Sequence, residues 1–178
     1  GVESIGMSLN PSVVTDGSRV YVAWMTRGED KQFKLFVRQS NDGGEHWTDP
    51  VMALSSPNQP DSHRLVRTVD GLLLCWLNQD AVRCSRSVDQ NSSWSEGFAL
   101  DGSAGAEGIL LETDHKGRAH LLVARKPEGD KARLNLFHAI AETGMEFSGL
   151  QRVSGGVPYT ANTILPVLTL GDDDSVLV

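Results

Sequence analysis

The chain has 178 residues, 39% of them hydrophobic, so it is long enough to bury the core of one domain or slightly more. Its 16 basic and 23 acidic residues give a net charge of -7, and the scattered basic residues exclude a Lys/Arg stripe for nucleic acid or anionic lipid. The longest nearly pure apolar run, Leu72 to Leu77, is far shorter than the roughly 20 residues that span a bilayer.

Short runs typical of strands follow one another along the chain, separated by clusters of Gly, Asp, Asn and Pro. The clearest are 19–25 (RVYVAWM), 33–39 (FKLFVRQ), 71–77 (GLLLCWL), 119–125 (AHLLVAR) and 133–139 (RLNLFHA). No segment carries an apolar stripe of period 3.6 over the length of a helix. The pattern predicts an all-β chain.

One short motif recurs after the strand-like runs. Its most complete copy is SNDGGEHW at 40–47, with degraded copies at 87–94 and 140–147. The matching positions are Ser40, Asp42, Gly44 and Trp47, then Ser87, Asp89 and Trp94, then Glu142, Gly144 and Phe147. The aromatic residues recur about every 50 residues, the length of one four-stranded propeller blade. We expect a single region over 1–178, with blades at about 8–51, 52–99 and 100–153 and a partial blade at 154–178.

This motif, S-x-D-x-G-x-x-W, resembles the Asp box, or BNR repeat, of sialidases (neuraminidases) and related β-propellers. The resemblance implies a β-propeller of four-stranded antiparallel blades, of which about three and a half are present. Closed propellers have about four to eight blades. The chain is therefore expected to be a section of a longer propeller, or to complete a ring by self-association through exposed blade edges. The resemblance also favours a secreted or periplasmic location.

The residue types of the motif indicate a structural turn. Glycine at 43 or 44 supplies positive φ, and the Asp42 carboxylate can accept hydrogen bonds from N–H groups of its own loop. Trp47 then returns to pack against the strands. We therefore expect Asp42 to organise a turn and not to act as a catalytic acid.

Blade topology directs the search for function to the opposite face, where the links between blades and the turns between second and third strands lie. The resemblance implies that ligands bind there. The candidate ligand-binding residues are Arg64, Glu107, Tyr159, His63 and Arg125.

Each candidate has a functional and a structural interpretation. Arg64 is the best match to the arginine-isoleucine-proline segment of sialidases, although Val66 stands where the proline would be; it either clamps an anionic sugar or, the favoured role, pairs with Asp61 or a neighbouring blade. Glu107 is an acid or base only if burial raises its pKa, and a hydrated carboxylate is favoured.

The remaining candidates carry weaker signals. Tyr159 is a nucleophile only beside a partner glutamate, so an amphipathic ring on the channel wall is favoured. His63 is expected to be a surface donor. Arg125 takes the place that Trp24 and Trp76 hold in the first two blades.

No metal site or cofactor is expected. Asp172–Asp174 lacks the alternating ligands of a calcium loop and is predicted to be a solvated turn. Cys75 and Cys84 lie on consecutive strands and are expected to be free, packed thiols, although they could meet across the turn between them.

The sequence favours a non-catalytic or incomplete glycan-binding module of a carbohydrate-active protein. One alternative is part of an active exo-sialidase that cleaves terminal anionic sugars such as sialic acid, and another is a propeller that binds a protein. The degraded repeats and the missing arginine-isoleucine-proline segment favour the binding module.

Overall fold

A computed structural model describes residues 9–79, 81–126, 129, 133–143, 146–154, 157–158, 168–170 and 176–177. These residues form strands and turns without a helix, so none of them belongs to a helix that could cross a membrane. The predicted all-β class is confirmed. Tyr159, Gly144 and Asp172–Asp174 lie outside the described residues.

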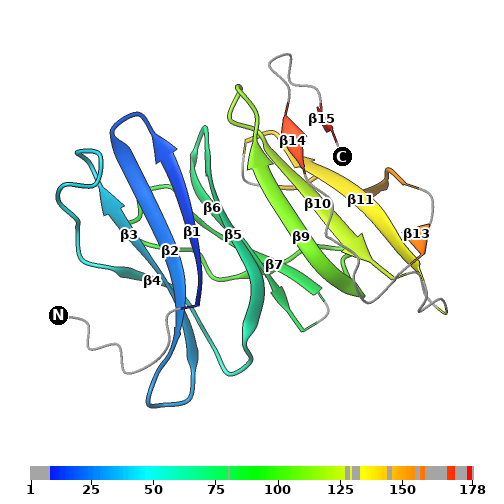
Figure 1. Cartoon of the computed structure of the whole chain (residues 1–178), viewed down its shortest axis with the longest axis horizontal. Coiled ribbons are helices and arrows are strands. Elements are labelled where there is room, and N and C mark those ends of the chain that lie inside the picture. Colours follow the sequence, from blue (N-terminus) through cyan, green and yellow to red (C-terminus); the bar gives the residue numbers. More distant parts are fainter. Residues whose placement is uncertain are drawn as a thin grey trace.

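Three antiparallel sheets lie side by side, each with its strands in chain order (Figure 1). Sheet 1 contains β1 (Leu9–Asp16), β2 (Arg19–Arg27), β3 (Phe33–Ser40) and β4 (Val51–Ser56). Sheet 2 contains β5 (Pro60–Thr68), β6 (Gly71–Asn78), β7 (Ala81–Ser87) and β8 (Phe98–Ala99). Sheet 3 contains β9 (Ala106–Thr113), β10 (Ala119–Arg125), β11 (Arg133–Ala141) and β12 (Gln151–Arg152).

Two shorter pairings complete the described strands. β13 (Val157–Pro158) pairs with β11, and β14 (Thr169–Leu170) pairs with β15 (Val176–Leu177). Four-stranded up-and-down sheets packed face to face, with each first strand beside the next, are the blades of a β-propeller. The chain is a partial propeller.

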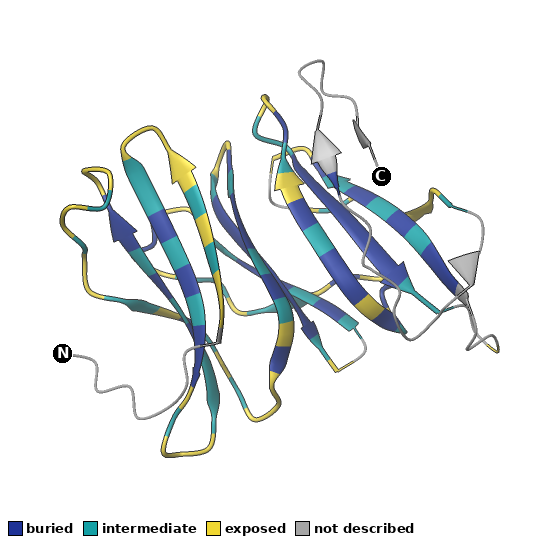
Figure 2. Cartoon of the chain, in the orientation of Figure 1, coloured by how far each residue is buried: buried dark blue, intermediate teal, exposed yellow. Residues whose placement is uncertain are grey.

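Sheet 2 is the middle layer, which explains the uninterrupted apolar run in β6. Leu72, Leu74 and Trp76 pack toward sheet 1, whereas Leu73, Cys75 and Leu77 pack toward sheet 3. A strand covered on both faces needs no polar alternation. Figure 2 shows buried residues along the strands and exposed residues gathered in the turns at both ends.

The expectation of free thiols is wrong, because Cys75 and Cys84 form a disulfide between β6 and β7. Pairing starts at Asn78 and Ala81, and each step back along β6 is matched by one step forward along β7. The two cysteines are therefore direct partners, with Cα atoms 4.1 Å apart and both side chains fully buried. This Cα separation is close to the roughly 4.5 Å of a non-hydrogen-bonded antiparallel pair.

Candidate functional site

In the turn after β3, both carboxylate oxygens of Asp42 are bonded to residues of the same turn. Ser40 donates its hydroxyl to Asp42 Oδ1 (2.7 Å), and the backbone N–H of His46 donates to the same oxygen (2.9 Å). Oδ2 lies 2.7 Å from His46 Nδ1. The His46 backbone bond, then the Ser40 hydroxyl and the His46 ring, hold the pKa of Asp42 well below its usual range.

The rest of this turn is closed by Gly44 and Trp47. The Gly44 N–H donates to Ser40 Oγ (2.8 Å), and Trp47 Nε1 donates to the Gly44 carbonyl (2.9 Å). Gly44 has φ of 102°, which favours glycine. With both carboxylate oxygens occupied, Asp42 is placed to hold the turn in shape.

The turn after β7 repeats this arrangement with different residues. Ser87 donates to Asp89 Oδ1 (2.8 Å), as does the Ser93 N–H (2.9 Å). The Ser93 hydroxyl and N–H, followed by Ser87, lower the pKa of Asp89 to about 2. Asn91 replaces the glycine and keeps a left-handed backbone with φ of 71°. Its amide accepts from Trp94 Nε1 (2.8 Å) and donates to the Val37 carbonyl (3.1 Å), so it also ties sheet 2 to sheet 1.

The third copy of the motif differs. Glu142 is exposed and approaches Arg118 at 3.8 Å, while Phe147 packs against the core between sheets 2 and 3. Gly144, which would close the turn, lies outside the described residues.

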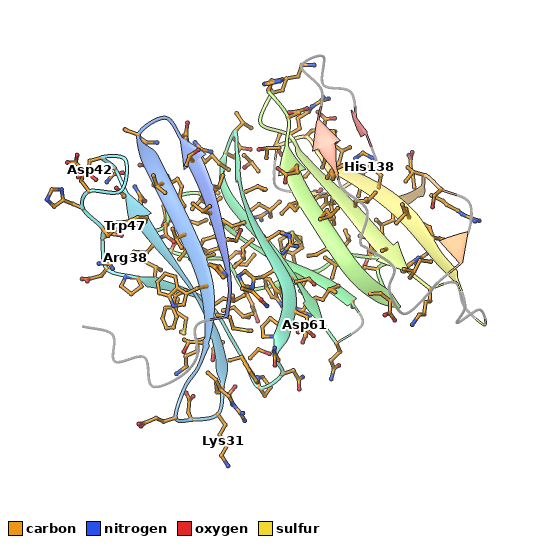
Figure 3. The ribbon with its side chains drawn as sticks, viewed as in Figure 1. Lys31, Arg38, Asp42, Trp47, Asp61 and His138 are labelled. Atoms are coloured by element: carbon orange, nitrogen blue, oxygen red, sulfur yellow. A yellow bond between two sulfur atoms is a disulfide. The ribbon has the colours of Figure 1, made fainter. Side chains whose placement is uncertain are left out.

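The candidate ligand-binding residues that the structure describes lie toward the other end of the sheets. Figure 3 shows Asp42 at one end of sheet 1, with Lys31 at the opposite end of that sheet and Asp61 at the same opposite end of sheet 2. β1, β5 and β9 all start at this opposite end, β5 lying between β1 and β9. Blade topology predicts this separation of the two sets of turns.

Each of these three first strands carries a bulge near its start, and we call this end of the sheets the bulged end. Asn10 and Pro11 both stand opposite Trp24, and Ser62 and His63 both stand opposite Trp76. In β9, Glu107 is the extra residue between the partners of Ala124 and Arg125. Asn10 and Ser62 each have φ of 51°, a left-handed backbone that is uncommon outside glycine. Bulges redirect side chains and are frequent beside active sites.

His63 is buried, so the expectation of a surface donor is wrong. It is 1% exposed, and neither ring nitrogen has a hydrogen-bond partner. It lies on the face of β5 that carries Leu65 and packs against sheet 1. Burial, then the charge of Arg64, lowers the pKa of His63 to about 4. The nearby backbone of Ala23 acts in the opposite direction, but neither ring nitrogen makes a hydrogen bond with it. The imidazole is neutral at pH 7.

Arg64 is half-buried, and its guanidinium makes one hydrogen bond among the described residues. Its Nη1 donates to the carbonyl of His63 (2.9 Å), and its charge reaches Glu112 on β9. The ion pair with Asp61 that the sequence allows does not occur among the described residues. A guanidinium has five N–H donors, so most of those on Arg64 remain available to a ligand.

Glu107 and Arg125 are engaged with neighbouring residues. Glu107 is exposed and pairs with Lys126 Nζ at 2.9 Å. Arg125 lies over the ring of Phe137, 4.0 Å from its centroid, and donates to the carbonyl of Gly102. The structure therefore brings Arg64 and His63 together on β5, whereas Glu107 and Arg125 lie on sheet 3.

Sequence reasoning missed the bulges and the burial of His63. The sequence signal for the bulges was a break in the alternation of apolar and polar residues at the start of each first strand, in LNPS, PDSHR and AEG. A candidate metal group was missed as well: Asp42, Glu45 and His46 hold ligand atoms within 4.8 Å of one another, but all three are exposed and Asp42 is already bonded by its turn.

No protein-family model and no curated protein sequence matches the chain. Solved structures do resemble it. Xylan β-1,4-xylosidase from Bacillus halodurans is 13% identical with a TM-score of 0.58, over 99% of this chain and 37% of that one. Penicillium chrysogenum α-L-arabinanase is 13% identical with a TM-score of 0.57, over 85% of this chain and 52% of that one.

A Hadza microbial sialidase is 14% identical with a TM-score of 0.55, over 83% of this chain and 37% of that one. The chain thus spans between about a third and half of the length of these three structures. At such low identity the likeness concerns the fold: the chain has the architecture of part of a β-propeller.

Proposed function

We propose that this chain is part of a glycan-binding β-propeller whose ligand lies at the bulged end of β1, β5 and β9. The observation that carries the proposal is the coincidence of three bulges at one end, with His63 in the middle bulge and Arg64 directly after it. The fold likeness to a xylosidase, an arabinanase and a sialidase supports a carbohydrate ligand.

The chemistry of the bulged end suits a hydroxyl-rich ligand. Bulges release backbone N–H and C=O groups from the strand ladder, and sugar hydroxyls need both donors and acceptors. Arg64 adds a charged donor that can hold a carboxylate in two parallel hydrogen bonds, which favours an anionic sugar of the sialic acid type.

Binding without hydrolysis is the function we propose. Glycoside hydrolysis needs an acid and a nucleophile or base in defined positions. Glu107, the candidate acid, is exposed and paired with Lys126. Tyr159, the candidate nucleophile, lies outside the described residues. The turns at 40–47 and 87–94 act as Asp boxes in this proposal, and hold the hairpins away from the ligand.

The test is a binding measurement on purified protein with a panel of neutral and sialylated oligosaccharides. Loss of a charge-assisted hydrogen bond costs about 1.5–3 kcal/mol, so Arg64→Ala should weaken binding by about 10- to 150-fold. Arg19→Ala is the matched control, because Arg19 begins β2 at the far end of sheet 1. Equal weakening by both variants, or no glycan bound at all, would refute the proposal.

A fluorogenic sialoside assay on the same preparations separates binding from catalysis. No turnover is expected from a binding module. Turnover that disappears in Arg64→Ala would replace our proposal with the exo-sialidase alternative.

A further inference from the structure

A second cluster of chemically active side chains lies on sheet 3. His120 on β10 and His138 on β11 are diagonal neighbours on one face, since His120 pairs with Ile140 and Leu122 with His138. His120 Nδ1 and His138 Nε2 are 3.1 Å apart, and the ring planes differ by 23°. Figure 3 labels His138 on β11, in a different sheet from Asp42 and Asp61. Neither the turns nor the bulged end uses this pair.

Asp114 contacts His120 on the side of the ring away from His138. Its side chain is fully buried, 3.3 Å from His120 Nε2. A carboxylate at this distance is placed to accept a hydrogen bond from an N–H at His120 Nε2. His120 Nδ1, on the other side of the ring, faces His138.

This arrangement is the one that orients histidine for metal binding. A metal-bound histidine commonly donates its second N–H to a carboxylate, which sets the tautomer and raises ligand basicity. Two nitrogens on one tetrahedral zinc, each at 2.0–2.1 Å, stand about 3.3 Å apart. The observed 3.1 Å is close to that spacing. Without a metal, this spacing is that of an N–H···N hydrogen bond between the two rings.

Glu112 offers a third ligand from the adjacent strand. It is the direct register partner of His120 across β9 and β10, so both side chains leave the same face of sheet 3. The Glu112 side chain is exposed, and its carboxylate makes no hydrogen bond or ion pair among the described residues, although the charge of Arg64 reaches it. In the present rotamer it does not converge with the histidine nitrogens, and rotation about its free side chain is required.

We infer that His120, His138 and Glu112 form a binding site for a divalent transition-metal ion such as Zn²⁺ or Cu²⁺, with Asp114 as the outer partner of His120. Imidazole nitrogens select these ions over Mg²⁺ and Ca²⁺, which prefer oxygen ligands. Water completes the coordination on the half-exposed side of His138. The inference is independent of the glycan proposal.

The test is a titration of metal-free protein with Cu²⁺ and Zn²⁺ by calorimetry, for the native chain and three variants. Loss of outer partners alone weakens metal sites by about 10- to 100-fold, so His138→Gln should weaken binding at least about tenfold. Glu112→Gln, a change at an exposed position, should weaken it in the same direction. His46→Gln removes the exposed imidazole beside Asp42 and Glu45 and should leave one ion bound per chain.

Spectroscopy of the Cu²⁺ form gives a second readout. Electron paramagnetic resonance should show two equatorial nitrogens in native protein and in His46→Gln, and one in His138→Gln. The inference is overturned if no ion binds, if His46→Gln removes the site, or if His138→Gln and Glu112→Gln both bind as tightly as native protein.

Discussion

Asn91 is the residue whose replacement tests the turn architecture most sharply. It is 3% exposed, its backbone is left-handed, and its amide joins Trp94 of its own turn to the Val37 carbonyl of sheet 1. Asn91→Ala removes both hydrogen bonds and keeps a Cβ in a conformation that penalises it.

The cost can be worked out from these contacts. A buried polar group left without its partner costs about 1–3 kcal/mol, and Asn91→Ala removes the partner of two groups, Trp94 Nε1 and the Val37 carbonyl. Because asparagine already places a Cβ in the left-handed region, the advantage of glycine there, about 1–2 kcal/mol, enters only for Asn91→Gly. Asn91→Ala should therefore lower the free energy of unfolding by about 2–4 kcal/mol. Asn91→Gly should recover about 1 kcal/mol of this loss, because it relieves the backbone but restores neither hydrogen bond.

Urea denaturation followed by tryptophan fluorescence measures the effect. With a slope of about 2 kcal/mol/M, the Ala variant should unfold at about 1–2 M lower urea than native protein, with the Gly variant between them. The reasoning is refuted if Ala lies within about 0.5 kcal/mol of native protein, or if Gly is less stable than Ala.

Three further predictions concern the disulfide, His63 and the outer face of sheet 1. Alkylation of unreduced, unfolded protein should label neither Cys75 nor Cys84, and replacing both with Ser should lower stability by about 2–3 kcal/mol, the value for a loop of about ten residues; labelling of both thiols would contradict the pairing. The pKa of His63 is lowered from 6.5 to about 4 in the folded chain, so as pH falls the unfolded chain takes up a proton on this histidine before the folded chain does. The free energy of unfolding is therefore fully present above pH 6.5 and falls by about 3 kcal/mol as pH drops toward 4. His63→Gln should flatten this part of the plot of stability against pH, and an unchanged slope would show that His63 is not its source. Val13 and Met52 are 64% and 50% exposed on the face of sheet 1 that carries Trp24 and Phe36, so light scattering is expected to show self-association that Met52→Glu reduces, and a monomer at all concentrations would contradict this.

The repeat of Ser, Asp and aromatic residues was sufficient to predict the sheets and the end at which the turns lie. The spacing of the motif is informative because each sheet is one repeat unit, with the same order of strands and turns over about 50 residues. The turn role of Asp42 likewise follows from local chemistry, since its partners lie within four residues.

Features that depend on register between strands could not be predicted. The Cys75–Cys84 bond exists because the hairpin places the two residues opposite each other. His63 is buried because a bulge and the packing of sheet 1 enclose its ring, and periodicity does not reveal an inserted residue. Asn91 looked like an eroded glycine, yet its amide supplies a bond between sheets that glycine cannot make.

The most direct test of the central claim is a map of backbone amide shifts by NMR during titration with the glycan that binds best. We expect the largest shifts to cluster at Asn10, Ser62 to Arg64 and Glu107, at the bulged end, and to need about 10- to 150-fold more glycan in Arg64→Ala. Shifts centred on Asn41 to His46 and on Asn91, at the opposite end, would contradict the central claim.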